Sequence, residues 1–145
     1  MVEFCSKVKI PCKLITDNAV AHSLENVDYV LVSAEAVTEN GGVINRIGTY
    51  TAALCAKALK KPFYVVAESF KFSRLFPLNQ NDLPDYAKEK GSFDYFPGKV
   101  AADPEKKIDI QLCDFTPPDL ITMLITDTGI LTPSAISDEL LQMFN

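Results

Sequence analysis

Residues 49–67 read TYTAALCAKALKKPFYVVA. Alanine and leucine make up half of the first twelve residues, and the lysines gather toward their end, which predicts a helix over residues 49–60 packed on most sides. The lysines complement the C-terminal end of the helix dipole, and Pro62 stops the helix. The run Phe63–Ala67 that follows is mostly β-branched or aromatic, so it predicts a strand buried on both faces.

Two further apolar runs lie upstream, at Cys12–Thr16 and Asp28–Ser33, and each predicts a parallel strand. A helical stretch over residues 18–26 separates them, so the order up to residue 67 is strand, helix, strand, helix, strand. Right-handed crossovers then place helices on both faces of the sheet. We therefore expect a Rossmann-like, three-layer α/β fold with a mainly parallel sheet.

The second half of the chain is more varied. Residues 79–109 combine several prolines with many charged residues and predict a long irregular excursion. Residues 108–112 then alternate between apolar and polar side chains, as an edge strand does. Residues 116–119, Thr-Pro-Pro-Asp, predict the start of a helix that carries the apolar residues 120–125 and ends at Gly129.

Thr132 and Pro133 repeat the cap-and-proline signal and predict a final helix. This helix presents one apolar stripe, which can face its own domain or a second subunit. The residues of the stripe, which are our candidates for a subunit interface, are Ile136, Leu140, Leu141 and Phe144.

The chain of 145 residues, with 48% hydrophobic and 23% charged residues, has the size and composition of one compact domain over residues 1–145. It contains no apolar run long enough to span a bilayer, and its first residues lack the order of a secretory signal. We therefore expect a cytoplasmic protein with no membrane partner. Only about eleven residues precede the first predicted strand, which suggests that the chain begins partway through a structural unit.

Charge and cysteine content narrow the possible functions. Fourteen basic and nineteen acidic residues give a net charge of −5, so we expect no nucleic acid partner. The four cysteines, Cys5, Cys12, Cys55 and Cys113, form no C-x-x-C pair, and His22 is the single histidine. We expect buried thiols, a structural histidine, no metal and no cofactor.

Residues 33–50 lead from the carboxyl end of a predicted strand through a glycine-bearing loop into the helix that begins at residue 49. In open parallel sheets the ligand crevice lies at that edge, and the N-terminus of the next helix offers N–H groups to an anion such as phosphate. The candidate ligand-binding residues of this segment are Glu35, Asn40, Gly41, Gly42, Asn45 and Arg46.

Most of these candidates also have a purely structural interpretation. The two glycines either let the backbone approach a ligand or simply turn the chain. Asn45 can contact a ligand or cap the helix, and Arg46 can bind phosphate with its planar fork or remain solvated. Glu35 can act as a general acid or base, or it can pair with a cation at the surface. The segment contains no G-x-G-x-x-G pattern to decide between these interpretations.

Three stretches resemble one family of proteins: residues 39–49 (ENGGVINRIGT), residues 67–80 (AESFKFSRLFPLNQ) and residues 115–121 (FTPPDLI). They are similar to the regulatory subunits of eukaryotic translation initiation factor 2B and to the related methylthioribose-1-phosphate and ribose-1,5-bisphosphate isomerases. Residues 67–80 are most similar to the alpha branch of the regulatory subunits. The resemblance extends over almost the whole chain and implies the family's Rossmann-like C-terminal domain, without its N-terminal helical region.

The resemblance implies a regulatory role in translation initiation rather than catalysis. The complex formed by such subunits exchanges GDP for GTP on initiation factor 2 and is inhibited when that factor is phosphorylated. The implied partners are a second copy of the chain in a homodimer, sister regulatory subunits and phosphorylated initiation factor 2. A phosphorylated small molecule, either a sugar phosphate or a nucleotide, is the implied ligand.

The alternative function is an isomerase half-site. In the isomerases a Gly-Ala-Asp tripeptide provides a catalytic aspartate, and it matches Ser33-Ala34-Glu35 here. Glutamate displaces the carboxylate by one methylene, and a shift of about 1 Å can cost a hundredfold in rate. The family's catalytic cysteine has no match among the four cysteines, so we expect no catalytic residue. Arg46 stands where the family usually has lysine.

Overall fold

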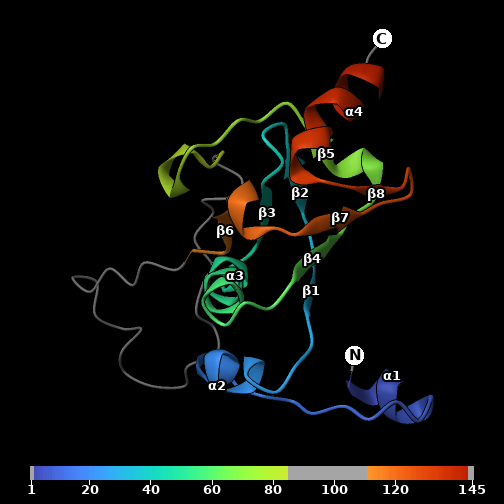
Figure 1. Cartoon of the computed structure of the whole chain (residues 1–145). Helices are drawn as coiled ribbons and strands as arrows, with labels where there is room; N and C mark the ends of the chain where they lie inside the picture. The colour runs from blue at the N-terminus through green and yellow to red at the C-terminus, as the bar shows by residue number, and fades with distance from the viewer. Residues whose placement is uncertain (1, 85–110, 144–145) are drawn as a thin grey trace, which may run out of the picture.

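The computed structural model of the chain describes residues 2–84 and 111–143, whose strands form two four-stranded sheets (Figure 1). In the first sheet the strand order is β1-β4-β7-β8. The bounds are β1 (Val30–Ser33), β4 (Phe63–Val66), β7 (Met123–Ile125) and β8 (Ile130–Leu131). The pairs β1–β4 and β4–β7 are parallel, and only β8 runs antiparallel. The expected α/β class with a mainly parallel sheet is confirmed.

The second sheet was not anticipated from the sequence. Its order is β5-β2-β3-β6. The bounds are β2 (Ala36–Thr38), β3 (Val43–Arg46), β5 (Phe72–Ser73) and β6 (Cys113–Thr116). Strands β2 and β3 form an antiparallel hairpin where we expected a loop, and β3 also pairs antiparallel with β6. The hairpin forms because Val37, Val43 and Ile44 are at most 1% exposed and form part of the core.

Helix α3 (Thr49–Ala58) confirms the predicted central helix. It follows Gly48, whose φ of 103° lies in the left-handed region that glycine adopts easily. Its buried Ala53 and Ala56 bring its backbone close to the sheet, and the short helix α2 (Val20–Leu24), preceded by a 3-10 turn at Asp17–Ala19, packs against it. Helix α3 lies beside β1 and β4, and α2 lies against α3 (Figure 1).

Alternation along the first sheet shows that only one of its faces is covered by the described residues. Phe63, Val65 and Leu124 point into the core and are at most 1% exposed. The residues on the opposite face stay open, with exposed fractions of 54% for Leu31 and 43% for Val66. Parallel sheets normally carry helices on both faces. We call this second surface, formed by Leu31, Ser33, Tyr64, Val66, Met123 and Ile125, the open sheet face.

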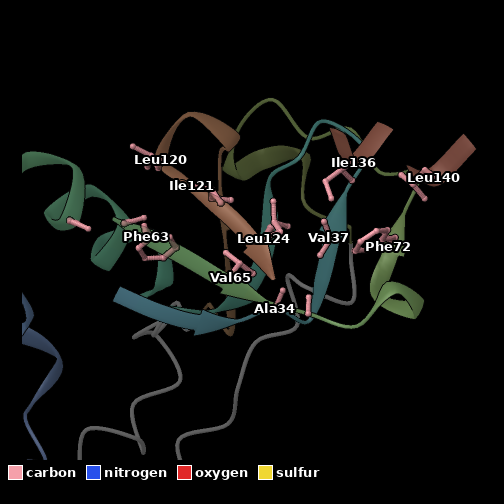
Figure 2. Packing of buried hydrophobic residues seen from close by; sticks show 14 of the residues in the cluster. Ala34, Val37, Phe63, Val65, Phe72, Leu120, Ile121, Leu124, Ile136 and Leu140 are labelled. Carbon is pink, nitrogen blue, oxygen red and sulfur yellow. The ribbon is translucent and has the colours of Figure 1, made fainter. Parts of the chain in front are cut away.

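One hydrophobic cluster joins the two sheets. Figure 2 shows Val37 and Phe72 of the second sheet near Leu124 of the first, and Ile136 and Leu140 above them. The last two residues belong to α4 (Ile136–Met143), which follows a 3-10 turn at Pro133–Ala135 and confirms the predicted final helix. The core therefore extends from α3, across both sheets, to the end of the described chain.

Two secondary-structure predictions are wrong. Residues 12–16 form no strand: they are exposed and pair with no other described strand, and a strand needs a neighbour to satisfy its backbone groups. Residues 120–125 do not form a helix. A 3-10 turn at Pro118–Leu120 leads instead into β7, because β-branched residues suit a strand and pairing with β4 buries Leu124 completely. Gly129 accordingly lies in the β7–β8 turn and ends no helix.

The remaining predictions fall partly outside the described residues. Residues 85–110, the greater part of the expected excursion, are outside, and so are Ile108 and Ile110 of the expected edge strand. The described part of the excursion begins with a 3-10 turn at Gln80–Asp82 that is capped by Asn79. Helix α1 (Val2–Lys7) contains no buried residue. Cys12 is exposed and the other three cysteines are only partly buried, so the expectation of buried thiols is wrong.

Candidate functional site

The candidate site lies where β3 ends and α3 begins. Asn45, which is 8% exposed, donates from Nδ2 to Thr49 Oγ1 at 3.1 Å. Thr49 Oγ1 in turn donates to the carbonyl of Arg46 at 2.7 Å. This chain of hydrogen bonds fixes the turn before α3 from within. The Asn45 amide therefore acts on the helix start, which is the structural alternative foreseen for it.

Arg46 and Glu35 form an ion pair at the rim of this turn. Arg46 Nε lies 3.5 Å from Glu35 Oε1, and the two side chains are 70% and 54% exposed. The backbone explains the pairing, because the Glu35 N–H donates to the carbonyl of Ile44 and so holds Glu35 beside the end of β3. An ion pair this exposed adds little stability, about 1 kcal/mol at most. Both groups can therefore rearrange around a ligand at small cost.

A pocket of about 270 Å³ adjoins Arg46. Its walls come from the first 3-10 turn, from α2, from β1 and from the start of α3. They include Asp17, Val32, Gly48 and Thr49. No side chain caps the 3-10 turn that begins at Asp17. The pocket thus places the Arg46 guanidinium and the Asp17 carboxylate beside mainly apolar walls, and the guanidinium can bind an anionic group there.

Asp114 on β6 was missed by the sequence analysis. It is 4% exposed, and its Oδ2 accepts hydrogen bonds from the backbone N–H groups of Gly48 at 2.7 Å and Tyr50 at 3.0 Å. Burial raises the pKa of Asp114, although the N–H groups of Tyr50, Gly48 and Thr49 act to lower it. The other carboxylate oxygen, Oδ1, is buried without a hydrogen-bond partner among the described residues. Asp114 is thus the cap of α3, supplied from a distant strand.

The tip of the β2–β3 hairpin contains the other three candidates. Asn40 Oδ1 accepts from Thr38 Oγ1 at 2.6 Å, and its Nδ2 donates to the carbonyl of Pro77 at 2.7 Å. Gly41 has a φ of 83° and its α-carbon lies against the backbone of Pro133, so a side chain there would collide. A side chain at Gly42 would likewise collide with the ring of Phe115. These contacts belong to the turn and its packing.

The structure therefore divides the six candidate residues into two groups. Glu35, Asn45 and Arg46 lie together at the base of the hairpin, next to α3. Asn40, Gly41 and Gly42 lie at its tip, beyond the paired residues Val37 and Val43. The ligand pocket beside Arg46 is lined by none of the three tip residues.

A second pocket, of about 580 Å³, shares Ile47 and Thr51 with the first and is otherwise lined by other residues, among them Tyr50, Cys113 and Asp114. It contains none of the six candidates. Cys113 pairs with Arg46 across the β3–β6 ladder, and burial raises the pKa of its thiol, which disfavours the reactive thiolate. Within residues 2–84 and 111–143, no three His, Cys, Asp or Glu side chains are grouped to hold a metal ion.

The predicted interface stripe is also divided. Ile136 and Leu140 are 0% and 3% exposed and lie in the core of their own domain. Leu141 is 56% exposed, and Phe144 lies outside the described residues. Of the predicted stripe, Leu141 is thus the described member available to a partner.

The fold and the site together define a class of protein. A mainly parallel sheet, with helices on one face and a pocket between β1 and the start of α3, is the architecture of a Rossmann-like domain. The family model described as the Initiation factor 2 subunit family matches residues 1–133, and the chain belongs to this family.

Its relatives include both regulatory subunits and enzymes. The chain is 50% identical over 139 residues to translation initiation factor eIF2B subunit alpha of Dictyostelium discoideum, a match that covers 93% of this chain and 43% of that protein. It is 36% identical over 132 residues to methylthioribose-1-phosphate isomerase of Heliobacterium modesticaldum, which covers 86% of this chain and 36% of the isomerase. The chain thus spans less than half the length of these curated relatives.

A solved structure agrees with the fold. The crystal structure of 5-methylthioribose 1-phosphate isomerase from Pyrococcus horikoshii OT3 superposes with a TM-score of 0.78 at 29% identity and covers 97% of this chain and 40% of that one. In the described part of this chain, no helix is both long and apolar enough to cross a membrane.

Proposed function

We propose that this chain acts as a regulatory, alpha-type subunit domain of the translation initiation factor 2B complex. In this role it binds sister regulatory subunits and takes part in the response of the complex to phosphorylated initiation factor 2. It associates as a homodimer and works in the cytoplasm. It carries out no catalysis of its own.

The observation that carries this proposal is the difference in identity between two relatives. Identity is 50% to the Dictyostelium alpha subunit and 36% to the Heliobacterium isomerase, over stretches of similar length. The carboxylate at the position of the isomerase aspartate also points to a non-catalytic role, because Glu35 is exposed and paired with Arg46. A general acid or base normally lies in a more secluded environment than this.

The pocket beside Arg46 supports a regulatory ligand. We propose that it takes a phosphorylated small molecule, a sugar phosphate or a nucleotide, with Arg46 as the phosphate contact and Glu35 as a partner for a sugar hydroxyl. Asn45 holds the turn that carries Arg46. Asn40, Gly41 and Gly42 serve this pocket only by shaping the hairpin that positions Glu35.

The proposed function is tested by affinity capture of the tagged chain from eukaryotic cytosol, with mass spectrometry for the sister regulatory subunits and initiation factor 2. We expect all of them to be recovered. The variant Leu141→Asp places a charge on the exposed side of α4 and should reduce recovery several-fold. Its matched control, Gln142→Asp, adds the same charge one residue further along. A chain that is folded by circular dichroism but recovers no sister subunit contradicts the proposal.

An isomerase half-site is the second candidate, favoured by one observation: Glu35 pairs with Arg46, which lines the pocket. The test is incubation with ribose 1,5-bisphosphate or methylthioribose 1-phosphate and detection of the ketose product. The regulatory proposal predicts no product above the blank. Product that disappears in Glu35→Gln and persists in Glu39→Gln, a carboxylate near the hairpin tip, would establish the enzyme instead.

A further inference from the structure

The N-terminus of α3 is the place where a Rossmann-like domain offers backbone donors to a phosphate. In this chain two of those donors are already occupied by a side chain. Asp114 Oδ2 lies 2.7 Å from the Gly48 nitrogen and 3.0 Å from the Tyr50 nitrogen. We infer that Asp114 is a resident anion for α3, which takes the place of a ligand phosphate and excludes anions from this helix N-terminus.

The local sequence explains why the helix accepts a cap from elsewhere. Gly48 occupies the N-cap position and has no side chain, and no side chain of the turn caps the helix. The φ of 103° at Gly48 is accessible to glycine but strained for other residues. A helix that lacks a local cap leaves its first N–H groups without partners, and a carboxylate is the best acceptor for them.

Asp114 is held rigidly in this position. It lies on β6 directly opposite Asn45 of β3, so the carboxylate and the turn are carried by neighbouring strands. The hydrogen bonds from Asn45 to Thr49 and from Thr49 to the Arg46 carbonyl fix the other side of the same turn. Strand pairing and side-chain bonds thus keep the carboxylate on the donors, and Asp114 cannot swing aside as a surface side chain would.

A second anion bound to the same N–H groups would be repelled by the negative charge of Asp114 at close range. The macrodipole of one helix provides only about half a positive charge at its N-terminus, which one carboxylate already neutralises. The pocket beside Arg46 is lined by Gly48 and Thr49 of this turn but not by Asp114. An anionic group in that pocket is therefore held by the Arg46 guanidinium, and the part of the ligand nearest α3 is uncharged.

The inference concerns the α3 N-terminus and goes beyond the proposed function. It is tested on the ¹⁵N-labelled full chain by titration with inorganic phosphate, following the amide signals of Gly48 and Tyr50 by NMR. In the wild type we expect these signals to stay in place. In Asp114→Ala, which frees the donors, both signals should move and saturate. In Asp114→Asn, which keeps an acceptor oxygen on them, they should again stay in place.

Two results would overturn the inference. One is saturable movement of the Gly48 and Tyr50 signals in the wild type, a measurement that needs no variant to fold. The other is a folded Asp114→Ala protein in which phosphate leaves both signals in place. Arg46→Gln separates this question from the proposed ligand pocket: it should abolish phosphate effects near Arg46 without moving the two amide signals. Failure of Arg46 to bind phosphate would count against the ligand pocket and leave the role of Asp114 intact.

Discussion

At the scale of single residues, buried polar and glycine positions shape this site more than exposed charges do. Glu35 and Arg46 pair in solvent, whereas Asp114 and Asn45 are buried and fix the start of α3. Buried hydrogen bonds to charged groups contribute about 1.5–3 kcal/mol, which is more than an exposed ion pair contributes. The geometry of the site therefore depends on residues that a ligand does not touch.

Replacing Gly42 by alanine tests the contact between the hairpin and β6. The new methyl group would collide with the ring of Phe115 and the backbone carbonyl of Thr116. We expect a loss of about 1–3 kcal/mol in the free energy of unfolding, as for other overpacked sites. Urea unfolding measures it, and the double variant Gly42→Ala/Phe115→Leu should recover part of the loss. Unchanged stability would mean that the hairpin tip packs differently.

The pH dependence of stability tests Asp114. Burial raises its pKa above the usual value near 3.8, so the folded chain holds this proton more tightly than the unfolded chain does. The contribution of Asp114 to stability is then fully present below that value and decreases as pH rises through the raised pKa. The amide in Asp114→Asn cannot titrate, so the wild-type stability minus that of this variant should fall across the interval and then stay constant. A difference that rises with pH contradicts the assignment.

At the scale of elements, strand pairing decided the structure where local propensity allowed more than one. The helix at residues 49–60 and the strands at 28–33 and 63–67 were predicted correctly because propensity, length and burial agree there. Residues 120–125 follow a strong helix-start signal, yet they form β7 because the edge of β4 is available to them. The β2–β3 hairpin escaped prediction because each of its strands is too short to show a clear alternation.

A pair of alanine variants tests whether residues 123–125 are a strand. Leu124 is fully buried, whereas its neighbour Ile125 is 37% exposed on the open sheet face. We expect Leu124→Ala to cost about 2–5 kcal/mol of unfolding free energy, because it leaves a cavity in the core. Ile125→Ala should cost less than about 1.5 kcal/mol, since that side chain loses little packing. Equal losses in thermal or urea unfolding would argue against the alternation of a strand.

Part of the candidate site could be predicted from the sequence, because some of its residues are close together along the chain. Glu35, Asn45 and Arg46 lie within eleven residues of one another, so the strand-to-helix pattern already placed them near α3. Asp114 could not be found this way, because its hydrogen-bond partners are 66 and 64 residues away in the sequence. Only the β3–β6 register brings them together, and no local signal in the sequence reports that register.

At the scale of the whole molecule, the open sheet face is the most unusual surface among the described residues. Its exposed apolar side chains come from three neighbouring strands, and Ile130 on β8, with an exposed fraction of 70%, extends the surface to a fourth. An apolar area of this kind on a parallel sheet is unusual for a monomer. A three-layer domain covers this face with helices, and the described residues of this chain do not.

A dye-binding experiment tests the open sheet face. The folded chain should bind 8-anilinonaphthalene-1-sulfonate and enhance its fluorescence, because the dye adsorbs to exposed apolar surface. Leu31→Lys and Val66→Lys should each lower the fluorescence, whereas Gln142→Lys, which adds the same charge on α4, should not. Equal fluorescence in all four proteins would place the dye elsewhere and show that this face is covered in solution.

The bond from Asp114 to the start of α3 also bears on the order in which the chain folds. Contacts between residues far apart in sequence form slowly, because a long loop must close, at a cost in entropy, before the contact can stabilise the chain. During synthesis, Gly48 and Tyr50 leave the ribosome well before Asp114 does, so α3 first exists without its cap. The turn at Gly48, which lines the pocket beside Arg46, is therefore completed only when β6 is in place, and the wall that this turn gives the pocket forms late.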